Sequence, residues 1–155
     1  MTSRIFSIYS IKPFLLLASL LLSLPALAVD AINTTRFGNV AIEGYDPVAY
    51  FTQSRPVKGD SDFEYEWKDA KWRFSSAENL ALFTANPEKY APQYGGYCAY
   101  AVAKNTTASI DPTQFTVVDD KLYLNFNKGV QQKWLANRDG FIVDADQNWP
   151  EILGR

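Results

Sequence analysis

The chain contains no histidine, a single methionine (Met1) and one cysteine, Cys98. Histidine is the usual general base near neutral pH and the commonest metal ligand. Its absence excludes Ser-His-Asp and Cys-His catalysis and every zinc, copper or haem site that needs an imidazole ligand. An enzyme would have to use a cysteine nucleophile without histidine, or carboxylates alone. We therefore expect that this protein is not an enzyme.

Clusters of basic residues are lacking as well. All 17 acidic residues, but only 13 of the 15 basic ones, follow Ala28, so that part of the chain carries a net charge of about −4. Nucleic-acid-binding proteins present a basic face to the phosphates, so we expect no nucleic-acid partner. No apolar run after Ala28 approaches the ~20 residues of a membrane helix. We expect this part to be soluble and free of the membrane.

A secretory signal peptide is predicted at residues 1–28. Two basic residues precede an apolar run over residues 14–24, and Ala26-Leu27-Ala28 is a small-x-small cleavage pattern. The apolar run is shorter than a membrane helix, although an uncleaved anchor is the alternative if the residues before it also insert. The sequence thus predicts a periplasmic or secreted protein.

Alternation of aromatic with polar residues predicts two antiparallel hairpins. Residues 63–67 and 72–74 have the period of a strand, with a turn between them. Residues 115–117 and 122–126 repeat this pattern around Asp119-Asp120, a dipeptide suited to a turn. Because these segments are short and separated by helix signals, we expect hairpins rather than one large sheet.

Several short helices are predicted from their start signals. We place them after the N-cap Asp46, after a capping box formed by Ser75 and Glu78, after Asn127, and over residues 139–148, with Trp149-Pro150 closing the domain. The expected fold is a small single α+β domain of antiparallel hairpins packed with these helices. Its parts are a signal peptide (1–28), a loose polar lead-in (29–41), the domain (42–150) and a tail (151–155), with no internal repeat.

The order of these motifs resembles a known family. The segments that carry the resemblance are Gly44–Phe51, Trp72–Ser76, Asn86–Tyr90, Tyr94–Val102 and Lys121–Asn125. Together they are similar to a YHS domain protein of the secreted bacterial kind, over about Ile42 to Pro150. The resemblance implies a small α+β module related to domains found in metal-handling contexts.

The resemblance does not extend to metal-binding residues. In shorter relatives, cysteines follow Asp-Pro-Val and occupy two positions of a Phe-Cys-Ser-x-x-x-Cys-like run. The corresponding residues here are Ala49, Ser75 and about Asn79. The histidine in the family's name is also missing, so metal binding does not carry over residue by residue.

Cys98 is the one residue with distinctive chemistry. We expect a ligand site in which its thiol lies among Tyr94, Tyr97 and Tyr100, with Asp46 as a further donor. A thiolate suits soft metals, whereas carboxylates and phenols suit hard ones. Cys98 is the only thiol candidate for a metal, and the sequence names no cofactor. The alternatives are that Cys98 is a small buried core residue and that Asp46 serves only as a helix cap.

Together these observations predict a non-catalytic periplasmic YHS-domain binding module, taking a metal ion or small ligand near Cys98. The alternative is a protein-interaction or accessory module in which Cys98 is purely structural. The partner is accordingly a small ligand or another protein.

Overall fold

The computed structural model describes residues 28–155, so the predicted signal peptide falls outside the described residues except for Ala28. In chain order the elements are η1 (Ile42–Gly44), α1 (Ala49–Thr52), β1 (Asp60–Trp67), β2 (Ala70–Phe74), α2 (Ala77–Ala85), α3 (Pro87–Tyr90), η2 (Gln93–Gly96), α4 (Ala99–Ala103), β3 (Asp111–Val118), β4 (Lys121–Asn125), α5 (Lys128–Ala136) and α6 (Arg138–Leu153). Within the described part, no helix is both long and apolar enough to cross a bilayer. The α+β class is confirmed.

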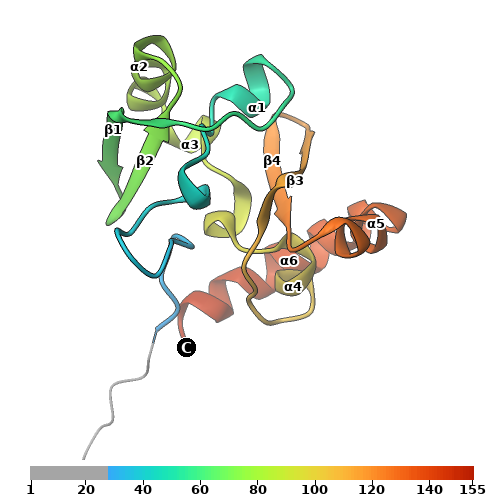
Figure 1. The fold of residues 1–155 in the computed structure, drawn as a ribbon. Helices are drawn as coiled ribbons and strands as arrows, with labels where there is room; N and C mark the ends of the chain where they lie inside the picture. The colour runs from blue at the N-terminus through green and yellow to red at the C-terminus, as the bar shows by residue number, and fades with distance from the viewer. Residues whose placement is uncertain (1–27) are drawn as a thin grey trace, which may run out of the picture.

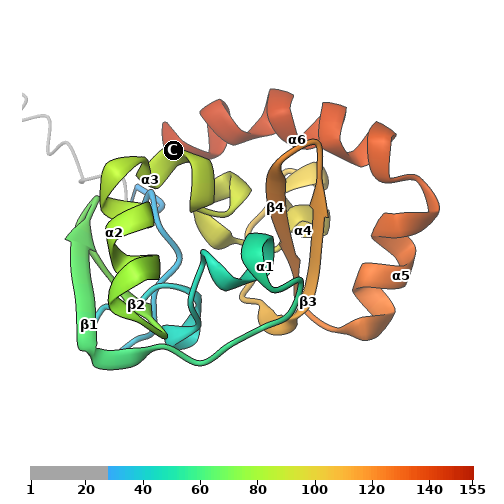
Figure 2. The ribbon, with the colours of Figure 1, turned by 90° about the horizontal axis from the view of Figure 1, so that it is seen from above.

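The elements form two halves, each built on one hairpin (Figure 1). One half holds β1, β2, α2 and α3, and the other holds β3, β4, α4 and α5. Helix α6 packs along α4 and runs past the second half until its end lies beside α3 (Figure 2). The end of the chain is thereby returned to the first half.

Both predicted hairpins are present, and both close with the same kind of turn. Lys68-Asp69 joins β1 to β2, and Asp119-Asp120 joins β3 to β4. The φ angles of these four residues lie between 50° and 59°. Positive φ at both central residues gives a turn whose twist matches that of the flanking strands. Aspartate tolerates this conformation well, which explains its presence in each turn.

Aromatic side chains dominate two hydrophobic clusters. In the first, the rings of Trp72 and Phe83 lie 5.1 Å apart; in the second, those of Tyr123 and Trp134 lie 5.3 Å apart. All four side chains are almost completely buried. Each contributes roughly 1.5–3 kcal/mol or more through the apolar surface it removes from water.

The predicted capping box at Ser75 is wrong by one residue. Ser76 caps α2, its hydroxyl accepting a hydrogen bond from the backbone N–H of Asn79 at 3.2 Å. Ser75 instead directs its hydroxyl and its N–H to the carboxylate of Asp46. This tertiary contact displaces the local pairing of Ser75 with Glu78.

Helix α6 does not end at Trp149-Pro150 as predicted. It continues to Leu153, so the expected boundary between residues 150 and 151 falls inside a helix. Proline inside a helix removes one backbone hydrogen bond and costs about 3 kcal/mol. Burial of Ile152, only 1% exposed, offsets that cost, and the Asn148 amide ties α6 to the backbone of α4.

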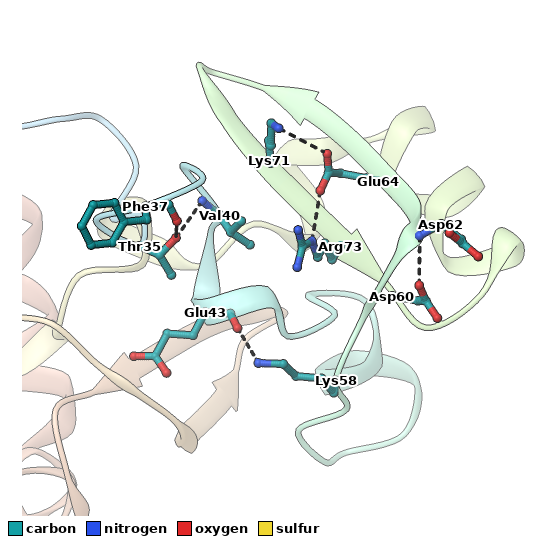
Figure 3. A network of polar contacts seen from close by, with 10 residues as sticks. All are labelled: Thr35, Phe37, Val40, Glu43, Lys58, Asp60, Asp62, Glu64, Lys71 and Arg73. Atoms are coloured by element: carbon teal, nitrogen blue, oxygen red, sulfur yellow. Dashed lines mark hydrogen bonds and ion pairs between the residues drawn. The ribbon is translucent and has the colours of Figure 1, made fainter.

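The segment before the domain is packed rather than loose. Ile32 is 7% exposed, and the N–H of Asn33 donates to the carbonyl of Gly95 at 2.8 Å. The Thr35 hydroxyl closes the following turn by bonding Phe37 and Val40 (Figure 3). The apolar residues within this polar stretch anchor it, which is why the expectation of a loose lead-in fails.

Candidate functional site

Asp46 lies at the start of α1 and acts as its cap, as predicted. One carboxylate oxygen, Oδ1, accepts hydrogen bonds from the N–H groups of Val48 at 2.9 Å and Ala49 at 3.3 Å. These donors would otherwise be orphaned at the helix N-terminus. The carboxylate therefore fixes the direction in which α1 leaves the turn.

The second oxygen of Asp46 joins α1 to the start of α2. Oδ2 accepts from the Ser75 N–H at 2.8 Å, the Ser75 hydroxyl at 2.6 Å and the Asn79 amide at 2.7 Å. The Asp46 side chain is completely buried. A buried carboxylate is tolerated only when such donors replace its hydration shell, and here five of them do.

The residues at the family's thiolate positions do not fit a metal ion. Ala49, Ser75 and Asn79 all lie at the Asp46 carboxylate, but they supply a methyl group, a hydroxyl and an amide. The last two already donate to Asp46. Among residues 28–155 no group of three or more acidic, histidine or cysteine side chains could hold a metal. This cluster is a hydrogen-bonded joint between two helices.

Cys98 is buried at the N-terminus of α4. Its side chain is 1% exposed and belongs to the first hydrophobic cluster, and its Sγ lies 3.7 Å from Oδ1 of Asn125. The Cys98 N–H donates to the carbonyl of Ala108 at 3.0 Å. Neither Cys98 nor Asp46 lines either of the two cavities of about 350–380 Å³. These contacts are those of a core residue.

The three candidate tyrosines turn to different partners. The Tyr94 hydroxyl donates to Oδ1 of Asp146 at 2.8 Å. The ring of Tyr97 packs 5.9 Å from that of Trp149, and the ring of Tyr100 packs 5.1 Å from that of Phe141. Of the five predicted site residues, only Tyr94 lines the larger cavity.

That larger cavity is a cleft of about 380 Å³ between the two halves of the molecule. Its walls come from the β1–β2 turn, α3, η2, the lead-in and the last turns of α6. The side chains that give it its character are Trp67, Lys68, Glu88, Tyr94, Asp146 and Trp149. Aromatic walls with a few polar groups are typical of small-ligand sites.

The cleft already holds an ammonium group, which belongs to the protein. Lys68 Nζ lies 2.8 Å from Oε1 of Glu88 and 4.3 Å from the ring centroid of Trp67. An aromatic face and a carboxylate together form a cation site. The side chains of Lys68 and Glu88 are 46% and 74% exposed, so their ion pair is weak and easily exchanged.

The phenols near the cleft stay protonated at neutral pH. Burial, followed by the hydrogen bond to Asp146, raises the pKa of Tyr94 well above its usual value. Burial, followed by the charges of Asp146 and Asp119, raises the pKa of Tyr123 to about 12. Neither phenol serves as a base; Tyr94 acts as a hydrogen-bond donor that positions the Asp146 carboxylate.

Sequence reasoning missed the cleft because its walls are distant in the chain. Trp67 was interpreted as packing, and Trp149 as the end of the domain. The alternation that placed Trp67 in a strand gave no sign that α6 would return to it. A charged pair next to a tryptophan, Lys68 with Glu88, was the only local signal.

Two hairpins with side-chain-capped helices and a buried, fully bonded carboxylate define a small α+β module without a metal centre in the described residues. The family model of the YHS domain matches residues 48–94, and the chain therefore contains a YHS domain. The match covers Ala49, Ser75 and Asn79 and ends at Tyr94. Searches of the curated proteins and of the solved structures find no match.

Proposed function

We propose that this protein is a secreted, periplasmic, non-catalytic binding module that takes a small organic cation in the cleft between α3 and α6. The observation that carries the proposal is the position of Lys68. Its ammonium is held by Trp67 and Glu88 at the edge of the cleft, where it represents the kind of group that the cleft accepts.

The charges of the cleft favour the same class of ligand. Two carboxylates, Glu88 and Asp146, face one base, Lys68. Trp149 adds a second indole, and the hydroxyl of Tyr94 fixes one oxygen of Asp146. A cation that enters displaces Lys68 from Glu88 and gains aromatic contact, which adds about 0.5–1 kcal/mol at exposed sites and more where water is excluded.

In this proposal Cys98 has a structural role. Its burial and its distance of 3.7 Å from the Asn125 amide oxygen support packing over metal or ligand binding near the thiol. The predicted signal peptide supports secretion, and the absence of histidine from the sequence supports a role without catalysis.

Calorimetric titration with choline tests the proposal, with 3,3-dimethylbutan-1-ol as the neutral compound of the same shape. We expect choline to bind at least 10-fold more tightly than the alcohol. Lys68→Ala removes the internal competitor and should tighten choline binding about 2–5-fold, which corresponds to 0.5–1 kcal/mol. Glu88→Gln should weaken it by a similar factor.

Lys71→Ala is the matched control, because Lys71 lies on the same hairpin but pairs with Glu64 at 3.8 Å, not with Glu88 (Figure 3). It should leave choline binding unchanged. Equal binding of choline and the neutral alcohol, or no response to Lys68→Ala, would contradict the proposal.

A further inference from the structure

We infer that the chain is a tandem pair of one structural module, with residues 42–90 as the first copy and residues 94–141 as the second. The family match covers only the first copy, apart from its last residues. The sequence gave no sign of a repeat, and that prediction is wrong for the fold.

The spacing of the elements carries the inference. Each element of the second copy begins 51 residues after its counterpart: β1 and β3 at 60 and 111, β2 and β4 at 70 and 121, α2 and α5 at 77 and 128, α3 and α6 at 87 and 138. The paired strands have equal lengths, and so do α2 and α5. Unrelated hairpins and helices vary by several residues at each boundary, so this agreement indicates one repeated unit.

The two hairpins share an irregularity as well as their length. In each, the regular pairing is interrupted after the first residue and resumes four residues later, at Glu64 and at Phe115. The first residue of each also makes the same local bond: the carboxylate of Asp60 accepts from the N–H of Asp62, and that of Asp111 accepts from Thr113 (Figure 3 shows the first). Bulges are specific features of a fold.

The helices are capped at equivalent positions. Ser76 accepts from the N–H of Asn79 at the start of α2, and Asn127 accepts from the N–H of Val130 at the start of α5. A single asparagine, Asn86 in one copy and 137 in the other, separates this helix from the next.

A rare backbone conformation precedes each hairpin. In η1 and its connection, residues 42, 43 and 44 have φ angles of 48°, 52° and 81°; in η2, residues 94, 95 and 96 have 56°, 60° and 80°. Three successive positive φ values are costly for side chains other than glycine. The spacing here is 52 residues, because the following loop of the second copy is one residue shorter.

This register makes Cys98 the counterpart of Asp46. The N–H of Asp46 donates to the carbonyl of Val57 at 2.9 Å, and the N–H of Cys98 donates to that of Ala108 at 3.0 Å. The counterparts of Ser75 and Asn79 are residues 126 and 130, a phenylalanine and a valine, whose side chains donate no hydrogen bonds. A carboxylate there would lack the donors that Asp46 has, whereas a thiol is tolerated in an apolar site.

The aromatic cores are also equivalent. Trp72 and Phe83 pair at 5.1 Å and 32°, and their counterparts Tyr123 and Trp134 pair at 5.3 Å and 37°. In each pair one ring comes from the second strand of a hairpin and the other from the helix that follows. The two copies have thus kept the geometry of the pair and exchanged its chemistry.

The copies differ where the cleft forms. Trp67, Lys68 and Glu88 correspond to residues 118, 119 and 139, a valine and two aspartates, so the cation-holding group belongs to the first copy alone. Helix α6 continues 12 residues beyond Phe141, the counterpart of Tyr90 at the end of α3. This extension carries Asp146 and Trp149 to the first copy, and the cleft of the proposed function therefore lies between the copies.

Exchange of the aromatic pair tests the duplication. Trp72→Tyr with Phe83→Trp introduces the pair of the second copy into the first, and Tyr123→Trp with Trp134→Phe does the reverse. We expect each double variant to unfold cooperatively, with a fall in Tm no more than half the sum of the falls of its single variants. The control, Phe74→Tyr with Phe83→Trp, copies nothing from the second unit and should be additive.

Non-additivity in either exchange supports the duplication. Additive falls in both exchanges, or the same coupling in the control, would overturn it. The measurement follows thermal unfolding and not choline binding, so its failure is separate from failure of the proposed function.

Discussion

Replacement of Asp46 by alanine tests whether its buried carboxylate joins α1 to α2. The substitution removes the acceptor of five hydrogen bonds and leaves donors of Val48, Ser75 and Asn79 unpaired in the interior. Each orphaned donor costs about 1–3 kcal/mol, and loss of the helix cap costs about 1 kcal/mol. With some donors reaching water after relaxation, we expect a loss of about 4 kcal/mol.

That loss is a large fraction of the 5–15 kcal/mol that stabilises an ordinary domain. It corresponds to a fall in Tm on the order of 15 °C. Urea unfolding followed by tryptophan fluorescence measures it, provided that the slope of the transition is unchanged. Asp60→Ala is the control, because Asp60 is exposed and accepts one local hydrogen bond from Asp62; it should cost less than about 1 kcal/mol. A cost below 1 kcal/mol for Asp46→Ala would refute the joint.

Three further outcomes follow from the buried side chains. Stability should fall as pH rises above about 10, by about 1.4 kcal/mol per pH unit per phenol, because folded Tyr123 keeps its proton up to a pKa of about 12 and the unfolded chain does not; Tyr123→Phe should reduce that slope in urea titrations at pH 9–11.5. Cys98 should react with a thiol reagent only upon unfolding, and Cys98→Ala should leave choline affinity unchanged in calorimetry. Trp134→Phe should cost only about 1 kcal/mol in urea, because it removes a buried indole N–H without a partner in the described structure.

Local signals predicted the hairpins and most helix starts. Aspartates at 119 and 120 and the caps Asp46 and Asn127 act on neighbours within a few residues, so the sequence alone shows them. Ser75 was assigned to a cap because its partner Asp46 lies 29 residues away. Such tertiary competition is invisible to a local pattern.

The cleft and the repeat depend on distant contacts and could not be predicted in this way. Pro150 normally marks the end of a helix, yet burial of Ile152 carries α6 onward and brings Trp149 to the cleft. The two copies share geometry while their residues differ, as Phe83 and Trp134 show. Packing conserves volume and position more strictly than identity.

The most direct measurement is an NMR titration of the tryptophan indole N–H signals with choline. The cleft contains Trp67 and Trp149, whereas Trp72 and Trp134 are at most 1% exposed in the two cores. We expect choline to shift the first two signals saturably and to leave the other two in place. Four unmoved signals, or shifts confined to Trp72 and Trp134, would contradict the assignment of the cleft as a cation-binding site.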